Sequence, residues 1–334
     1  MKAVGLYQGL PSEDSQSLLD LEIATPTPNS RDLLVKVQAI SVNPVDTKQR
    51  MNTEASEMPR ILGYDAVGEI IATGEEVTMY KEGDVVYFAG DVTRQGHNAE
   101  YTLIDERLVA LKPKSLTVEE AAAMPLTTLT AWEALFDRLG IDAEKDAGKT
   151  ILIINGAGGV GSIATQLARL SNLYVVTTAS RKETISWCKE NGADRVIDHH
   201  KLLKQQLSGL DIDYILCLHD TSTYLQTMLK LIKPQGKICT IVELSEPADL
   251  DLLKDKSATF VYEFMFTRSK YQTEDQIKQH EILTKAAHYF DQGKLKSTLK
   301  QVLEPFNAET MRKAHLFIES GHSIGKLVVK GFES

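Results

Sequence analysis

The chain has 334 residues, of which 43% are hydrophobic and 25% charged, a composition typical of a globular protein with about two domains. A net charge of −9 argues against a nucleic-acid partner, which normally requires a basic face. The N-terminal segment has no apolar signal-peptide core, and no run of about 18 apolar residues predicts a membrane span. The three cysteines are scattered and form no disulfide framework, so we expect a cytoplasmic protein.

The first third of the chain is predicted to be rich in β-structure. We expect strands at residues 2–6, 20–24, 33–42 and 63–72, with turn-forming residues between them. Residues 81–88 are predicted to form a turn followed by a strand, and residues 96–104 to bring another strand after a loop. A helix should follow from Leu116, with Thr117 as its N-cap and Glu120 completing a capping box. Pro125 is expected to end this helix, and a second helix is predicted for residues 126–139.

From Thr150 onward strands and helices are predicted to alternate. The expected strands are residues 150–155, 173–178, 195–197, 213–218, 237–242 and 258–262. Such alternation predicts an α/β fold, a doubly wound parallel sheet with helices on both faces and a cofactor at the carboxyl ends of its strands.

The end of the chain carries two predicted helices, at residues 274–291 and 308–320, and a last strand at 325–330. This tail is too short to form a good domain alone. We therefore predict that it completes the β-rich N-terminal part, giving a discontinuous domain of residues 1–125 and 265–334 around a nucleotide-binding domain of residues 126–264.

A glycine motif follows the first strand of the alternating region. Gly156, Gly158 and Gly161 fit the pattern G-x-G-x-x-G, between an apolar run and a helical pattern. In a dinucleotide site the first glycine allows a sharp turn, the second lets the pyrophosphate approach, and the third lets the helix pack on the sheet. A merely structural glycine turn is the alternative, but the strand–turn–helix context favours nucleotide binding.

The residues after the second predicted strand favour NADPH over NADH. An acidic residue there would bind the ribose 2′-hydroxyl of NAD, yet Ser180 and Arg181 follow this strand and the first carboxylate is Glu183. A hydroxyl and a planar guanidinium suit a 2′-phosphate. The alternative is a solvated helix start capped by Ser180. A flavin cofactor is disfavoured, because flavin-binding proteins usually carry this glycine motif near the N-terminus, whereas here it begins at Gly156.

Several short motifs in a fixed order resemble the medium-chain dehydrogenase/reductase superfamily and its zinc-independent quinone-oxidoreductase branch. They begin at Ser41 (SVNPVDTK), Leu62 (LGYDAVG), Glu82 (EGDVV), Asn98 (NAEY), Asn155 (NGAGGVG) and Ile324 (IGKLV). The resemblance implies a GroES-like catalytic domain, a Rossmann domain, a homodimer and NADPH-dependent reduction of carbonyl or α,β-unsaturated substrates.

The resemblance also indicates where zinc-containing relatives carry their ligands. Asn43, Tyr64 and, approximately, Pro125 stand at those positions, and none offers a thiolate or an imidazole. Asp46 and Asp65 remain, but two carboxylates without soft ligands make a poor zinc site. We therefore expect no bound metal.

Site residues follow from the same resemblance. It implies that Asn43 and Tyr64 act on the substrate, Asn43 as an amide donor and Tyr64 as a phenol that donates a hydrogen bond or a proton. Cofactor contacts are expected from Thr127, Thr130, Gly156, Ala157, Gly158, Gly159, Val160, Gly161, Ser180, Arg181 and His199. The alternatives are that Tyr64 is a core aromatic bonded to a backbone carbonyl, with water as the proton donor, and that His199 is an exposed loop histidine.

We thus predict an NADPH-dependent, zinc-free oxidoreductase that reduces quinones or α,β-unsaturated carbonyls by hydride transfer. One alternative is an alcohol dehydrogenase-like carbonyl reductase, and another is an NADPH-binding protein with little turnover. We further expect Asp46 to belong to a structural hydrogen-bond network and His97 to lie in an exposed loop. The three cysteines are predicted to be core residues.

Overall fold

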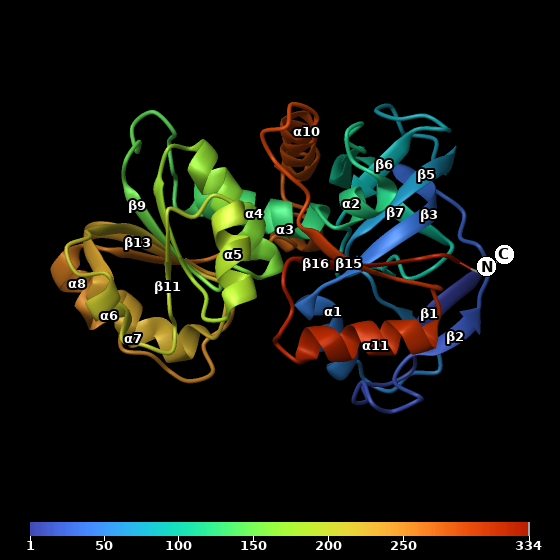
Figure 1. Cartoon of the computed structure of the whole chain (residues 1–334). Helices are drawn as coiled ribbons and strands as arrows, with labels where there is room; N and C mark the ends of the chain where they lie inside the picture. The colour runs from blue at the N-terminus through green and yellow to red at the C-terminus, as the bar shows by residue number, and fades with distance from the viewer. Residues whose placement is uncertain (333–334) are drawn as a thin grey trace. The chain divides into compact units, whose positions relative to one another are not determined.

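The computed structural model describes residues 1–332, and these residues form two compact units. The first unit contains Met1–Leu126 and the chain from Phe266 onward, and the second contains Thr127–Met265. The ribbon in Figure 1 is coloured along the chain, so the return of the C-terminal segment to the first unit is visible as red elements beside blue ones.

The first unit is built around a seven-stranded sheet. Its strand order is β15–β16–β3–β5–β6–β8, with β7 also paired to β3. A smaller sheet has the order β2–β1–β4. Only β15 and β16 run parallel; the other pairs in both sheets are antiparallel. These strands are β1 (Lys2–Leu6), β2 (Leu19–Glu22), β3 (Asp32–Val42), β4 (Arg60–Ile61), β5 (Ala66–Thr73), β6 (Val85–Phe88), β7 (Tyr101–Asp105), β8 (Val109–Leu111), β15 (Leu299–Leu303) and β16 (Lys326–Lys330).

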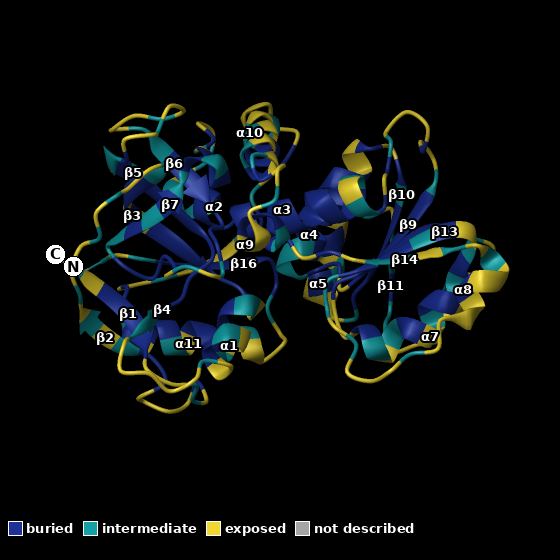
Figure 2. Cartoon of the chain, turned by 180° about the vertical axis from the view of Figure 1, so that it is seen from behind, coloured by how far each residue is buried: buried dark blue, intermediate teal, exposed yellow. Residues whose placement is uncertain are grey.

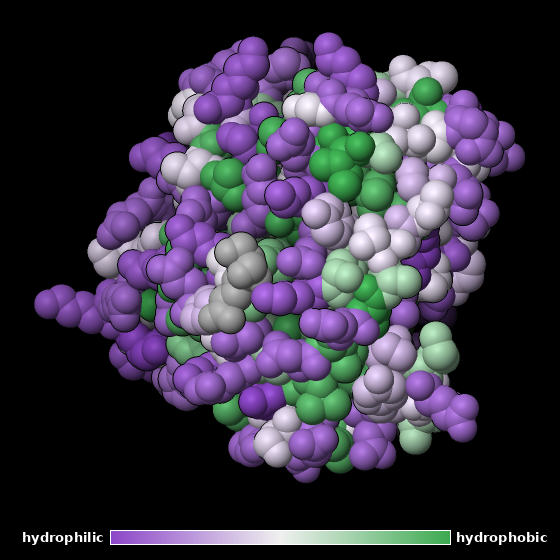
Figure 3. Space-filling model, turned by 90° about the vertical axis from the view of Figure 1, so that its right-hand side faces the viewer, coloured by the Kyte–Doolittle hydropathy of each residue, from purple (hydrophilic) through white to green (hydrophobic). Residues whose placement is uncertain are grey.

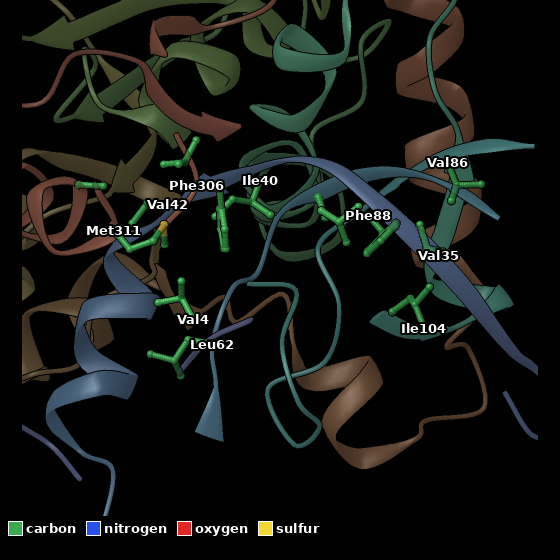
Figure 4. Packing of buried hydrophobic residues seen from close by; sticks show 14 of the residues in the cluster. Val4, Val35, Ile40, Val42, Leu62, Val86, Phe88, Ile104, Phe306 and Met311 are labelled. Atoms are coloured by element: carbon green, nitrogen blue, oxygen red, sulfur yellow. The ribbon is translucent and has the colours of Figure 1, made fainter. Parts of the chain in front are cut away.

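Helices surround these sheets and share one apolar core with them. Figure 4 shows Val35, Ile40 and Phe88 from the larger sheet in the same cluster as Val4 and Met311. Burial of such side chains contributes about 1.5–3 kcal/mol each, so residues from both ends of the chain stabilise this unit. The helices are α1 (Pro44–Met51), the 3₁₀ turn Glu106–Leu108, α2 (Val118–Ala122), the start of α3 (Pro125–Trp132), α9 (Thr267–Tyr271), α10 (Lys278–Asp291) and α11 (Ala308–Glu319).

The second unit contains a six-stranded, fully parallel sheet of order β11–β10–β9–β12–β13–β14. This is the strand order of a doubly wound dinucleotide-binding fold. Figure 2 shows its inner strands in dark blue, because helices cover them. The elements are β9 (Thr150–Ile154), α4 (Gly159–Leu170), β10 (Tyr174–Thr178), α5 (Lys182–Glu190), β11 (Arg195–Ile197), α6 (Leu203–Gln206), β12 (Ile212–Cys217), α7 (Thr221–Leu231), β13 (Ile232–Thr240), α8 (Asp251–Lys256) and β14 (Thr259–Tyr262), preceded by a π-helical segment, Glu133–Arg138.

The fold class predicted from the sequence is confirmed: a Rossmann-like parallel sheet is joined to a discontinuous β-rich unit. The Thr117 capping box is present, with Thr117 Oγ1 accepting from the Glu120 amide. Cys188, Cys217 and Cys239 are buried as free cysteines, as expected. Among the described residues, no helix has the length and apolarity needed to cross a membrane.

Other predictions about the elements were wrong. Residues 96–100 form a loop, since β7 begins only at Tyr101. Pro125 opens helix α3, where its missing N–H is not needed, rather than only ending the helix before it. Helices α1 and α9 and strand β15 were not predicted, because they are short and lack a clear apolar period.

The outer surface of the first unit is mainly hydrophilic. Figure 3 shows this side with hydrophobic residues scattered in small groups among charged and polar ones. Isolated surface apolar residues are normal in globular proteins, so this face carries no argument for a partner.

Candidate functional site

The glycine loop, which we define as Asn155–Gly161, connects β9 to α4 in the second unit. Its left-handed residue is Asn155, with φ of 70°, so the sharp turn predicted for Gly156 occurs one residue earlier. Gly156 is needed for a different reason: a Cβ there would lie 2.5 Å from Cβ of Thr177 on β10. A Cβ on Gly161 would lie 2.2 Å from the Asn155 carbonyl oxygen, which explains the close packing of helix against strand.

The start of helix α4 has the properties of an anion site. Gly158 occupies the N-cap position with an extended backbone, and no side chain caps it. The first turn holds no acidic residue, so the helix dipole and the amide groups there are not neutralised by the chain itself. Gly158, Gly159 and Val160 are partly accessible, and Ala157 is buried. These features fit the diphosphate of a dinucleotide.

Three predicted contacts to a 2′-phosphate lie at the ends of β10 and β11. Ser180 Oγ is 3.5 Å from His199 Nε2, so these two side chains are neighbours although 19 residues separate them. Arg181 is exposed and holds the N-cap position of α5, which the sequence had assigned to Ser180 in the alternative interpretation. His199 is half-buried rather than exposed, and burial together with the adjacent His200 lowers its pKa.

Thr127 and Thr130 are buried in helix α3. Their contact with the cofactor stays a prediction.

In the first unit, Asn43, Asp65 and Lys326 form a buried cluster that we call the lysine network. Asn43 Nδ2 donates to Asp65 Oδ2 at 2.8 Å. The Lys326 ammonium contacts the same Asp65 oxygen at 3.2 Å and also donates to Asn43 Oδ1. Asp65 Oδ1 accepts from the Leu126 amide at 2.7 Å. All three side chains are at most 4% exposed.

Asn43 and Tyr64, which were predicted to contact the substrate, both have buried side chains in this structure. The Asn43 amide donates within the protein, to Asp65 and more weakly to the Tyr64 carbonyl oxygen at 3.3 Å. Tyr64 is fully buried, its hydroxyl makes no hydrogen bond with residues 1–332, and its ring meets Phe266 edge-on at 5.4 Å. The backbone carbonyl expected in the alternative interpretation does not bind the hydroxyl. Both catalytic roles stay predictions.

Asp46 lies in a structural hydrogen-bond network, as predicted. Its Oδ2 accepts from the Asn43 backbone amide at 2.7 Å and thereby fixes the start of helix α1. Its Oδ1 is buried without a partner. Burial raises the pKa of this carboxyl to about 7, although the Asn43 amide and the Lys326 ammonium act in the opposite direction. Burial and the nearby Asp46 also raise the pKa of Tyr64, so its phenol is a weaker acid than a free tyrosine.

The structure corrects one expectation and adds one residue. His97 is buried, not exposed: its Nδ1 lies 2.9 Å from Thr102 Oγ1, and burial lowers its pKa to about 3. Lys326 was part of a motif but was assigned no role. The signal was available, because a lysine directly before the apolar run of residues 327–329 in the terminal strand is expected to need a buried partner.

Comparison with known proteins identifies the family. Residues 29–114 match the alcohol dehydrogenase GroES-like domain, and residues 191–329 match the zinc-binding dehydrogenase family. A zinc-type alcohol dehydrogenase-like protein of Staphylococcus epidermidis is 47% identical, over 98% of this chain and 99% of its own. The chain belongs to the medium-chain dehydrogenase/reductase superfamily.

Two further relatives extend this comparison. The crystal structure of a candidate zinc-dependent alcohol dehydrogenase from Rhizobium etli CFN 42 has a TM-score of 0.96 and 43% identity, covering 100% of this chain and 99% of that one. The NADPH-dependent alkenal/one oxidoreductase of Arabidopsis thaliana is 32% identical over 93% of this chain and 75% of its own length. The chain is therefore an oxidoreductase of this superfamily.

The names of the relatives from Staphylococcus epidermidis and Rhizobium etli mention zinc, but the residues of this chain do not fit that ion. Asn43 and Tyr64 supply an amide and a phenol, the Lys326 ammonium lies on the Asp65 carboxylate, and Asp46 Oδ2 is bound by the Asn43 backbone amide. Among residues 1–332, no three His, Cys, Asp or Glu side chains are placed to hold a metal. We assign zinc no part in the chemistry.

Proposed function

We propose that this protein is an NADPH-dependent, zinc-free oxidoreductase that reduces quinones or α,β-unsaturated carbonyl compounds. The observation that carries the proposal is the pairing of Ser180 with His199 beside exposed Arg181, at a position where an NAD-dependent enzyme holds an acid. The relative from Arabidopsis, whose name specifies NADPH and an alkenal/one substrate, supports the same choice.

The chain's own residues would serve binding and orientation. The amides at the start of α4 would hold the diphosphate, and Ser180, Arg181 and His199 would hold the 2′-phosphate. When bound, NADPH would supply the hydride. The acceptor then needs a proton, and the burial and raised pKa of Tyr64 favour water over this phenol as the donor.

Steady-state NADPH oxidation tests the proposal. We expect turnover with 9,10-phenanthrenequinone or with small enals, and slower or no turnover with saturated aldehydes. Turnover only with saturated carbonyls would favour the alcohol dehydrogenase-like alternative. Tight NADPH binding without turnover of any acceptor would favour a binding protein and contradict the proposed reaction. The homodimer, the small-molecule substrate and the cytoplasmic location also stay predictions.

A further inference from the structure

Lys326 is a buried cation contributed by the last strand of the chain. It is 4% exposed, and its ammonium contacts three oxygens: Asp65 Oδ2 and the Val42 carbonyl, each at 3.2 Å, and Asn43 Oδ1. An ammonium has three protons, so every donor is used. These partners are 261 to 284 residues distant along the chain. The Lys326 side chain therefore connects β16 to the end of β3 and to the residue before β5.

The donors around Asp65 indicate that it is a carboxylate. Its Oδ1 accepts from the Leu126 amide, and its Oδ2 accepts from Asn43 Nδ2 and from Lys326. A protonated carboxyl would need an acceptor for its hydrogen, and all three neighbours are donors. Burial raises the pKa of Asp65 and the Lys326 ammonium opposes that rise, so the carboxylate depends on the lysine.

The ammonium also fixes which way the Asn43 amide faces. Its Oδ1 points to Lys326, so Nδ2 is directed at Asp65 and at the Tyr64 carbonyl. The amide could turn over only by placing its NH₂ group against the ammonium, which cannot accept a hydrogen bond. Asn43 and Leu126 stand where helices α1 and α3 begin, so both helix starts are connected to this cation.

We propose that Lys326 is a positioning residue whose ammonium pairs with the Asp65 carboxylate and keeps Asn43 in one amide orientation, and so holds these two side chains in the active arrangement. The effect of Lys326 on turnover rests on the proposed function, in which Asn43 acts on the acceptor. Its effect on Asp65 and on the fold of the first unit is independent of that function.

Other charged groups near the lysine network must be considered in any pH experiment. Asp46 on α1 interacts with both Asp65 and Lys326, and the phenol of Tyr64 lies near Asp46. At the other end of β16, Lys330 pairs with Glu119 at 2.6 Å. Because Lys326 also lowers the pKa of Asp46, its removal changes the titration of both carboxyls, and Lys326→Met is therefore also compared in an Asp46→Asn background.

The test compares Lys326→Met with Lys326→Arg, Asp65→Asn and the double variant Lys326→Met/Asp65→Asn at pH 6 and pH 8. Without its lysine, Asp65 should become protonated as the pH falls, which removes the uncompensated charge. We expect Lys326→Met to lose at least tenfold in kcat/KM for the acceptor at both pH values, because protonation of Asp65 relieves the buried charge but does not restore the ammonium that orients Asn43. The double variant should show the same loss, and Lys326→Arg should retain most of the activity.

NADPH affinity serves as the control, because the glycine loop belongs to the other unit and should be unaffected by these changes. If Lys326→Met is folded and has wild-type kcat/KM at both pH values, the proposal is overturned. It is also overturned if the loss falls below threefold at pH 6, or if Lys326→Arg loses as much as Lys326→Met.

Chemical unfolding of the four variants separates this inference from the proposed function. If wild type turns over no acceptor, the proposed function fails, yet the inference still predicts that Lys326→Met is less stable at pH 8 than at pH 6, relative to wild type. It also predicts that Asp65→Asn removes this difference. Equal relative stability at the two pH values would contradict it.

Discussion

The glycine loop and the lysine network are both polar features at helix starts, but they are made in opposite ways. The loop is contiguous, and at the start of its helix, at Gly158, no side-chain cap hydrogen bond forms among the described residues. The network joins three segments of the first unit, and its buried side chains bind one another. The first arrangement leaves its donors available for a ligand, whereas the second uses its donors to hold the protein together.

The largest effect is expected when a methyl group is added to a glycine of the loop. Gly161→Ala places a Cβ 2.2 Å from a fixed backbone oxygen, so we expect a loss of about 3 kcal/mol in the free energy of unfolding. In Gly158→Ala the nearest atom is the end of the Asn155 side chain at 3.0 Å, which can move. Gly158→Ala should therefore fold normally and lose mainly NADPH affinity. Equal stability of the two variants in urea would contradict this account of the loop.

Arg181 tests whether the second unit discriminates between cofactors. Arg181→Ala should weaken NADPH binding by about 1.5–3 kcal/mol, the scale of a charge-assisted hydrogen bond, while NADH binding barely changes. Lys182→Ala, at the neighbouring exposed cation, is the matched control and should have a smaller effect. Fluorescence titration with both nucleotides measures this difference, and an equal loss for the two would refute the assignment.

These two regions also differ in how much of them the sequence predicted. The loop was found because a strand, three glycines and a helical pattern are adjacent in the chain; only the residue that makes the turn was wrong. The lysine network was missed because Asn43, Asp65 and Lys326 meet only after the terminal strand pairs with β3. Long-range pairing is set by the whole fold, so a local pattern could suggest that Lys326 needs a partner but not which one.

Burial explains the remaining differences in the same way. Tyr64 and His97 were assigned from their motif and their loop. Tyr64 is covered by Phe266, which is distant in sequence, and His97 packs against Phe88 of strand β6. Residue type and spacing do not report such coverage.

Asp46, beside the lysine network, provides a test of pH dependence. Its pKa is about 7 in the folded protein and 3.8 in the reference state, so between about pH 4 and 7 the folded chain holds a proton that the unfolded chain has lost. Stability should therefore fall as pH rises through this range, by at most about 1.4 kcal/mol per pH unit. Asp46→Asn should lack this contribution, and urea unfolding of both proteins from pH 4.5 to 7.5 measures it. Parallel pH profiles for the two proteins would show that Asp46 titrates normally.

The smallest expected effect concerns His199 in the cofactor region. Burial and His200 lower its pKa, so it is neutral in the free protein at pH 7, and a bound phosphate should favour its protonated form. NADPH affinity, relative to NADH, should rise a few-fold from pH 8 to pH 6.5. In His199→Gln this rise should be absent. The variant also serves as the control for protonation of the 2′-phosphate, which occurs in both proteins. If the variant keeps the same rise, His199 does not contact the phosphate.

Calorimetric titration of the purified protein with NADPH and with NADH tests the central claim most directly. We predict saturable binding of NADPH at one site per chain, at least tenfold tighter than that of NADH, and the same affinity after treatment with a zinc chelator. The absence of binding by either nucleotide, equal affinities for the two, or loss of binding on chelation would contradict the account.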